Sequence, residues 1–575
     1  MICPIIVGIT CIFAQVAAQW TCGGASYTPG SINFTQTCYD AVQKCINQFA
    51  VNASQVDCQD LEGNVSMQQQ ASKASNSDYA SAFEDILEFC ILGGRMTGTW
   101  FDGSDGQWYW IAAEKGCYSS SGTIGTHGPG FCIQDQADTI INGCYPQPEP
   151  NSGALQVLRT AKTPNGFTSS GRGWNSWGLQ ALPSSTSIIP EWTGLNQESV
   201  LAQCSVLAGT DFRAMGYDLC SVDSGWSTND VDEYGRIQYN DELFNLPQLA
   251  EQLHGIGLKL GVYTIPGVPC GATNRTIKGT NIQIGDVLNG NNDGLDHCDW
   301  DFSKDGVEQW HDSLIELWTS WGLDMIKLDY VMPGSPQNGA NLMCDTSAVV
   351  EAYHKAIANS GSQVRLDISW KLTFITWQVV QRAIDNYRQY ISLQKQQNVP
   401  ITIYPDLDGL FTCNPQNLTG VSDKERVTIM NHWLGAGANL ILGCDLRHID
   451  ELGMKLLTST QSVAFANFAA LNPMQPRNPG TGNNLAQQLQ AWIGGPDESD
   501  KAYVLLVNYG PDQGSGGFGT SLAGVQKLSI SLSDLGIAGR NWKITDVWNG
   551  NSTTVSSSYI ANLDEGESQL LYLEG

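Results

Sequence analysis

The chain has 575 residues, a formal net charge of −28 and 18 Trp, and only 15% of its residues are charged. This length allows two to four domains with large buried cores. The strong negative charge argues against nucleic acid or an anionic membrane surface as a partner. We therefore expect the protein to handle neutral ligands.

The first 18 residues form an apolar segment that ends in Val16, Ala17 and Ala18, which predicts a cleaved secretory signal. Asn-x-Ser/Thr glycosylation sites support an extracellular location. They lie at Asn33, Asn52, Asn64, Asn274, Asn417 and Asn551. No later apolar run reaches the roughly 18 residues of a transmembrane helix. We expect a secreted protein without a membrane partner.

Residues 19–150 contain eight Cys, which predicts a disulfide-rich N-terminal module whose pairing stays open. Seven more Cys lie between Cys204 and Cys444, and at least one of these should be free. Because no Cys-x-x-Cys pair occurs and the His are scattered, we predict no metal site and no cofactor. The module also carries three Trp and a Tyr within residues 100–110, either as a core cluster or as an exposed platform for carbohydrate.

Residues 160–475 alternate strand-like apolar runs with amphipathic, helix-like stretches. The runs are 217–226, 257–265, 321–331, 364–370, 400–408 and 438–446. Such alternation predicts an α/β fold with a parallel sheet, and about 300 residues with this spacing favour a (β/α)8 TIM barrel. Residues 485–575 change to short strands separated by Gly, Asn and Asp turns, which predicts a C-terminal antiparallel β-sandwich domain.

Polar residues follow several of the predicted barrel strands. They are Asp223, Tyr263, Lys327, Asp329, Ser369, Trp370, Asp406 and Asp408. In 321-WGLDMIKLDYV-331, alternation puts Lys327 and Asp329 on one face of the strand. Because active sites of such barrels lie at the carboxyl ends of the strands, this mixture of carboxylates, a cation and aromatic rings indicates a sugar pocket. The alternative is structural: strand-end Asp residues that cap helices, and a Lys327–Asp329 ion pair.

Several motifs between residues 164 and 475 occur in the order found in a known family. They are 173-GWNSWG-178, 216-GYDLCSVDSGW-226, the block 232–263 that ends in GLKLGVY, 321-WGLDMIKLDY-330, Ser369-Trp370, 405-PDLDGL-410 and 443-GCDL-446. This part of the chain resembles glycoside hydrolase family 27, the α-galactosidase and α-N-acetylgalactosaminidase group.

The resemblance implies a retaining exo-glycosidase that removes terminal α-D-galactosyl residues from a galactose-containing oligo- or polysaccharide. Asp329 would be the nucleophile, and Lys327 would bind sugar hydroxyls and keep the carboxylate ionised. Asp223 would accept a hydrogen bond from a sugar hydroxyl. Three aromatic residues would shape the pocket, namely Trp177, Tyr263 and Trp370.

The sequence departs from the family pattern at three positions. Ser224 replaces a usual second Asp, Val331 stands where Cys is common, and Ser369 stands where animal α-galactosidases have Glu and the N-acetylgalactosamine-specific relatives have Ser. An α-N-acetylgalactosaminidase, a β-L-arabinopyranosidase and an inactive carbohydrate-binding relative therefore stay open as alternatives.

The acid/base residue is expected three or four residues after an Arg on the sixth strand. An alignment on Arg388 leaves no acid at that distance, whereas an alignment on Arg382 brings Asp385 into the role. We predict Asp385 as acid/base, with Asp408 as the alternative, and Arg388 as a substrate-binding residue. The residues after Asp385 would then form the following helix.

Overall fold

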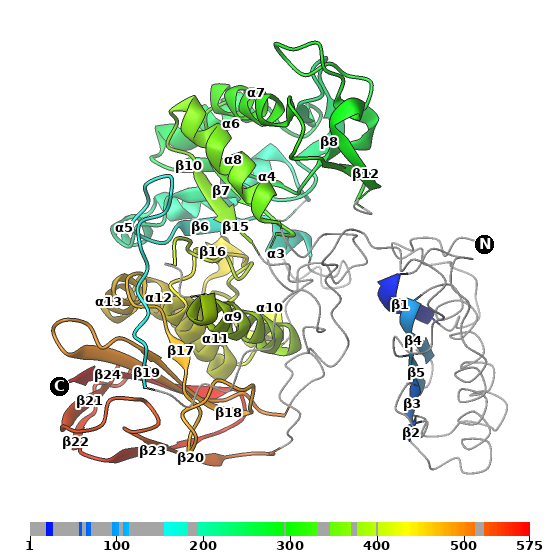
Figure 1. Cartoon of the computed structure of the whole chain (residues 1–575). Helices are drawn as coiled ribbons and strands as arrows, with labels where there is room; N and C mark the ends of the chain where they lie inside the picture. The colour runs from blue at the N-terminus through cyan, green and yellow to red at the C-terminus, as the bar shows by residue number, and fades with distance from the viewer. Residues whose placement is uncertain are drawn as a thin grey trace. The chain divides into compact units, whose positions relative to one another are not determined.

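The computed structural model describes residues 154–181, 192, 194–292, 295–331, 346–369, 377–397, 401–511 and 522–575, and five strands between residues 19 and 113 (Figure 1). The chain divides into two compact units, one of residues 1–135 with 336–344 and one of the remaining residues. Each unit is described by itself.

The first unit contains an antiparallel sheet of order β1-β4-β5-β3-β2. Its strands are β1 (Gln19–Ser26), β2 (Asp57–Gln59), β3 (Val65–Gln70), β4 (Arg95–Asp102) and β5 (Gln107–Ala113). The aromatic residues between 100 and 110 belong to the paired strands β4 and β5, where Trp100 lies opposite Tyr109. Their side chains, and with them the predicted platform or core cluster, lie outside the described residues.

The second unit is built on a curled parallel sheet of order β15-β14-β10-β7-β6-β16. The strands are β6 (Arg172–Asn175), β7 (Leu219–Val222), β10 (Lys259–Thr264), β14 (Leu323–Leu328), β15 (Arg365–Ile368) and β16 (Leu440–Leu442). Residues 401–411 join its two edges, because Asp406 pairs with Ser369 after β15 and Leu410 pairs with Leu442 of β16, both in parallel. This is the curled sheet of a (β/α)8 barrel, as predicted.

Helices cover the outside of this sheet (Figure 1). They are α3 (Trp177–Gln180), α4 (Gln197–Cys204), α5 (Thr210–Ala214), α6 (Leu246–Gly255), α7 (Val307–Ser320), α8 (Ser347–Ser360), α9 (Trp377–Gln397), α10 (Gln416–Thr419), α11 (Asp423–Gly435), α12 (Glu451–Thr458) and α13 (Thr460–Ala469). In α6 the buried residues Leu246, Leu249 and Leu253 recur at helical spacing, and the Asn245 side chain accepts from the Gln248 N–H to cap the start. In the part of the chain that is described, no helix combines the length and the apolar character needed to cross a membrane.

Shorter elements lie in the loops. Two small antiparallel sheets consist of β8 (Ser227–Val231) with β9 (Ile237–Tyr239), and of β11 (Val268–Pro269), β12 (Leu288–Asn292) and β13 (His297–Trp300). Disulfides join Cys204 to Cys220, Cys270 to Cys298 and Cys413 to Cys444. These bonds use six of the seven dispersed Cys, and Cys344 lies outside the described residues.

The C-terminal part of the second unit is the predicted β-sandwich. One sheet has the order β17-β18-β19-β24-β21-β22, and β20 pairs with β23. The strands are β17 (Gln475–Pro476), β18 (Leu489–Gly494), β19 (Lys501–Asn508), β20 (Gln526–Ser531), β21 (Trp542–Asp546), β22 (Ser552–Val555), β23 (Ser558–Leu563) and β24 (Glu567–Glu574). Alternate residues of both sheets, such as Leu506, Ile530 and Leu571, fill a common apolar core. The Thr428 hydroxyl of α11 donates to the Gly566 carbonyl, which ties this domain to the barrel.

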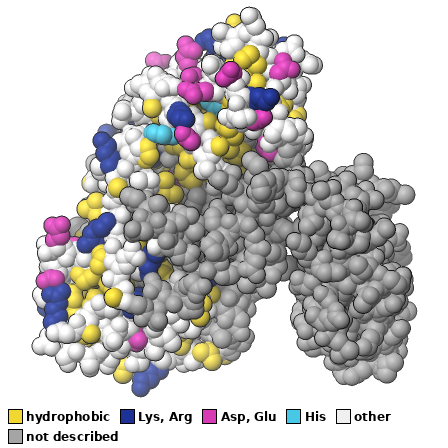
Figure 2. Space-filling view, viewed as in Figure 1, with side chains coloured by type: hydrophobic (Ala, Val, Ile, Leu, Met, Phe, Trp, Pro, Cys, Tyr) yellow, Lys and Arg dark blue, Asp and Glu magenta, His cyan; other side chains and the backbone are white. Residues whose placement is uncertain are grey.

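The surface carries its charges in a mixed arrangement. On the face that Figure 2 presents, the Lys and Arg side chains of the described residues are interspersed with Asp and Glu and do not gather into one basic patch.

Candidate active site

A buried lysine lies at the centre of a group of carboxylates where three barrel segments end. Lys327, near the end of β14, donates from Nζ to Asp223 Oδ2 at 3.0 Å and to Asp408 Oδ1 at 3.1 Å. Asp223 follows β7, and Asp408 belongs to the segment 401–411. All three side chains are at most 3% exposed. The Lys327 ammonium also lies 5.7 Å from the centre of the Tyr263 ring in β10.

Asp329 lies directly after β14, beside this group. Its backbone N–H donates to the Thr264 carbonyl at 3.0 Å, and its Oδ1 accepts from the Tyr330 N–H at 2.8 Å. Tyr330 has φ of 59°, a left-handed conformation in which the chain turns away from the strand direction. The described ion pairs join Lys327 to Asp223 and Asp408 and not to Asp329, so the predicted structural pair of Lys327 with Asp329 is not what holds the lysine.

Burial and neighbouring charges set the protonation of this group. Burial raises the pKa of Asp329 to about 7, while the Lys327 charge acts to lower it and the Asp408 and Asp223 charges raise it. Burial alone would lower the pKa of Lys327, but the surrounding carboxylates, Asp223 first, raise it well above its usual value. The lysine is therefore charged, and Asp329 changes its charge near neutral pH.

A second pair of carboxyl groups lies beside Lys327, and the sequence did not single it out as a pair. Asp367 of β15 stands next to Lys327 of β14 in the strand register. It accepts a hydrogen bond from the Asn439 side chain, and its charge interacts with that of Asp406. Burial raises the pKa of Asp367 to about 6 and that of Asp406 well above its usual value. The pair therefore holds protons in the range where isolated carboxyl groups are ionised.

A sequence signal for Asp367 did exist. In 364-VRLDISW-370, alternation puts Asp367 on the same face as Ser369, as it puts Lys327 with Asp329 in 321–331. Ser369 is fully buried and pairs with Asp406 in the parallel bridge, so it lies at the same end of the sheet. Trp177 begins α3 immediately after β6, and its N–H donates to the Asn175 side chain at 2.8 Å. Trp370 lies outside the described residues.

The chain is similar to known proteins over nearly its whole length. Residues 191–467 match the α-galactosidase A family model, and residues 486–573 match that of the α-galactosidase C-terminal β-sandwich domain. The chain is 55% identical over 609 positions to α-galactosidase 3 of Hypocrea jecorina, covering 98% of this chain and 97% of the relative. The chain belongs to glycoside hydrolase family 27. It is a glycoside hydrolase, as its residue pattern predicted.

More distant relatives extend the similarity. An α-galactosidase of Cyamopsis tetragonoloba is 22% identical over 407 residues, which cover 68% of this chain and 82% of the relative. Among solved structures, a family 27 β-L-arabinopyranosidase of Geobacillus stearothermophilus in complex with arabinose matches with a TM-score of 0.57 and 20% identity. The match covers 71% of this chain and 97% of the arabinopyranosidase. It shows that the two proteins share a fold.

The structure corrects the position expected for Asp385 in this family 27 hydrolase. Helix α9 begins at Trp377, so Asp385 lies in the middle of a helix of 21 residues and not at the end of a strand. The reason is the helical spacing of buried residues along this segment. These are Val380, Ala383, Ile384, Tyr387 and Ile391. The Asp385 side chain lies outside the described residues, and its role as acid/base stays a prediction.

Arg388 is also in α9, and its described contact differs from the one expected. Its Nη1 donates to the Asn484 carbonyl at 3.3 Å, in the segment that leads into the sandwich, rather than to the group around Lys327. Ser369 pairs directly with Asp406. In residues 346–369 and 401–411, no further barrel strand lies between these two residues. The alignment with the Hypocrea relative runs over 609 positions, at least 34 more than the 575 residues of this chain, so that relative has residues that this chain lacks.

We predict that Asp367→Asn changes how stability depends on pH. The folded-state pKa of Asp367, about 6, exceeds its ordinary value of 3.8, so the folded protein binds more protons between these values and loses stability as pH rises through them. The variant keeps the Oδ1 acceptor but has no proton to lose. It should therefore lose less stability than the wild type between pH 4 and pH 7, by up to about 3 kcal/mol. Unfolding free energies from urea titrations at both pH values measure this difference, and parallel losses in the two proteins would show that Asp367 is ionised throughout.

Proposed function

We propose that the chain is a secreted, retaining exo-α-galactosidase whose nucleophile is Asp329. The observation that carries the proposal is the position of Asp329 after β14, beside a charged lysine that two further strand-end carboxylates hold. The 55% identity to a protein named α-galactosidase supports α-D-galactosides as the substrates. Terminal galactosyl residues of oligo- and polysaccharides are the expected substrate groups.

In the first step an ionised Asp329 oxygen attacks the anomeric carbon, and the bond from that carbon to the leaving oxygen breaks. The leaving oxygen takes the proton of the general acid. In the second step water gives a proton to the carboxylate that the general acid has become. The water oxygen attacks the anomeric carbon, and the ester bond to Asp329 breaks. The configuration at this carbon is inverted twice and is therefore retained.

Each residue around Asp329 has a separate task in this scheme. Lys327 opposes the effect of burial and favours the ionised nucleophile. One Asp223 oxygen accepts a hydrogen bond from Lys327, and the other accepts one from the Ser224 N–H. The remaining lone pairs of both oxygens would accept a hydrogen bond from a sugar hydroxyl. The partly buried Tyr263 ring limits the space beside the lysine.

The choice between Asp385 and Asp408 as acid/base is helped by the contacts of Asp408. Its Oδ1 accepts from both Lys327 Nζ and the Gly409 N–H, at 3.1 and 2.8 Å. Both hydrogen bonds tie Asp408 to the lysine and to its own loop. Asp408 is thus better suited to holding Lys327 than to proton transfer, and Asp385 remains the proposed acid/base.

The second candidate is an inactive carbohydrate-binding protein, because Ser369 pairs directly with Asp406. A chain that lacked an acid would bind galactosides but would cleave poor leaving groups extremely slowly. Turnover of an unactivated α-galactoside by the wild type separates the two functions. The same assay with α-N-acetylgalactosaminides and β-L-arabinopyranosides tests the alternative specificities.

Secretion is supported by two structural observations. The described sequon residues Asn274, Asn417 and Asn551 are all exposed, as glycosylation requires. Three disulfides are formed in the second unit, and such bonds persist in oxidising compartments.

We predict that a mechanism-based fluoroglycoside labels Asp329. Asp329→Ala should lose the label and lower kcat about 10⁴-fold or more, because the variant lacks the proposed nucleophile of the covalent intermediate. Peptide mapping by mass spectrometry locates the label. Asp324→Asn is the matched control, since Asp324 lies in the same strand on its other face, where it accepts from the Leu260 N–H and pairs with His254. A label on any other residue would contradict the assignment.

We predict that Asp385→Ala spares the hydrolysis of aryl galactosides with good leaving groups and abolishes that of galactosides with poor ones. A good leaving group departs without a proton, so only the second class needs the acid. Steady-state kinetics on both classes measure the difference, and added azide should restore the second step. Equal losses on both classes, or no loss, would remove Asp385 from the mechanism.

A further inference from the structure

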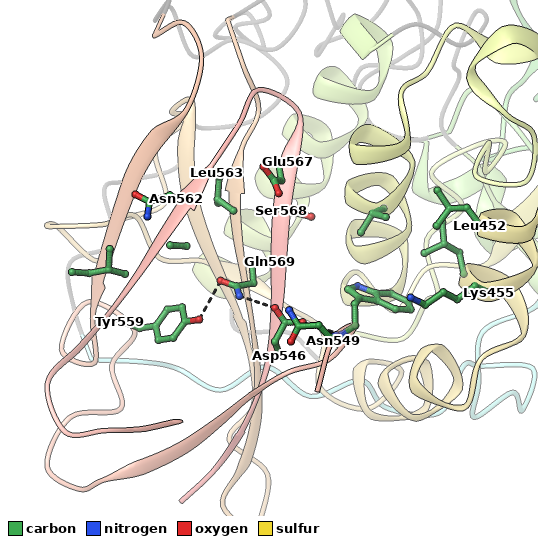
Figure 3. Close-up of a pocket in the computed structure, with 15 residues that line it drawn as sticks. Leu452, Lys455, Asp546, Asn549, Tyr559, Asn562, Leu563, Glu567, Ser568 and Gln569 are labelled. Atoms are coloured by element: carbon green, nitrogen blue, oxygen red, sulfur yellow. Dashed lines mark hydrogen bonds between the residues drawn. The ribbon is translucent and has the colours of Figure 1, made fainter. Parts of the chain in front are cut away.

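A pocket of about 440 Å³ lies between the barrel and the sandwich, apart from the residues around Lys327 (Figure 3). Helices α11 and α12 contribute one wall, with Leu452 and Lys455 from α12. Strands β23 and β24 and the loop after β21 contribute the other. This volume falls in the range of small-ligand sites, roughly 300–1,000 Å³.

Two aromatic side chains of the pocket are held in place by hydrogen bonds. The Trp548 indole N–H donates to Asn431 Oδ1 at 3.0 Å, and the Trp548 backbone N–H donates to Asp546 Oδ1 at 3.0 Å. The Tyr559 hydroxyl donates to Gln569 Oε1 at 3.3 Å. Both aromatic side chains are half-buried, so part of each stays open to a ligand.

The polar wall is organised by one buried carboxylate. Asp546 is 7% exposed, and its Oδ2 accepts from Gln569 Nε2 at 2.6 Å. Figure 3 shows the resulting chain from Tyr559 through Gln569 to Asp546, with Asn549 beside it. A wall that is fixed before a ligand arrives loses little side-chain entropy on binding.

The chemistry of the lining selects the kind of ligand. Lys455 faces a wall that carries Asp546 and Glu567, so the pocket has no excess of positive charge for a phosphate or carboxylate. Its other polar groups are uncharged amides and hydroxyls, including the exposed Asn549 and Asn562. Aromatic rings suit the C–H face of a pyranose, and amides hydrogen-bond its hydroxyls.

We propose that this pocket is a second, non-catalytic carbohydrate site, which holds a glycosyl unit of a polysaccharide while Asp329 cleaves elsewhere on the chain. The choice of a galactose-containing polysaccharide rests on the proposed function, whereas the pyranose chemistry rests on the pocket alone. A glycan attached to the chain itself is a second source of pyranose rings. Asn551 is an exposed glycosylation site in the same turn, where its N–H donates to Asn549 Oδ1 at 2.9 Å.

The test measures binding of galactomannan by affinity electrophoresis in the Asp329→Asn background, which prevents hydrolysis. Trp548→Ala and Asn562→Ala should each weaken binding about tenfold, while kcat/KM for an aryl α-galactoside, measured with Asp329 intact, stays within twofold of the wild type. Val525→Ala, at a site 64% exposed on the same domain, should change neither quantity. Trp548→Ala removes the hydrogen bond to Asn431 and with it any contribution of that bond to folding. Asn562 is exposed on β23, so Asn562→Ala tests the pocket without that change.

Unchanged galactomannan binding in both pocket variants would overturn the proposal. Binding that appears only after Asn551→Gln would also overturn it, because the pocket would then hold the chain's own glycan. The proposed function fails separately: galactomannan binding that depends on Trp548, without turnover of any α-galactoside, would support the pocket and contradict the α-galactosidase.

Discussion

The active end of the barrel depends on one buried ammonium group. Lys327 is 2% exposed, and a lone charge at such a depth would be prohibitive, so its neighbours must supply negative charge. Asp223 and Asp408 do this from β7 and from residues 401–411, which lie on different parts of the ring. The lysine can be satisfied only when these segments end at the same level. The charged group therefore links β7, β14 and residues 401–411 at one end of the barrel.

The same ammonium determines the chemistry available to Asp329. Three buried carboxylates close together repel one another, and burial adds to the preference for the protonated form. The lysine opposes both effects and leaves the pKa of Asp329 at about 7, within reach of neutral pH. Next to it, Asp367 and Asp406 retain protons, so they add little negative charge to the group at mildly acidic pH. Asp329 thus becomes the carboxylate that can gain or lose a proton under working conditions.

The alternation of side chains in 321-WGLDMIKLDYV-331 was sufficient to predict that Lys327 and Asp329 lie at a barrel mouth, because a buried strand has no other place for them. The sequence did not predict that Lys327 pairs with Asp223 and Asp408, since that depends on which strands are neighbours. Asp385 was placed at a strand end from a spacing rule, and the helical spacing of apolar residues in α9 prevailed. The carbohydrate pocket could not be predicted, because α12 belongs to the barrel, whereas β23 and the loop after β21 belong to the sandwich far along the chain.

The central claim is that Lys327 lowers the pKa of Asp329 against the effect of burial, and the pH dependence of kcat/KM in Lys327→Met tests it most directly. This profile reports the ionisation of groups in the free enzyme. Without the ammonium group, burial and the Asp408 and Asp223 charges act on Asp329 unopposed, so the acidic limb should move to higher pH than in the wild type. A lower plateau with an unmoved acidic limb would contradict the account, because it would mean that Lys327 only binds the sugar.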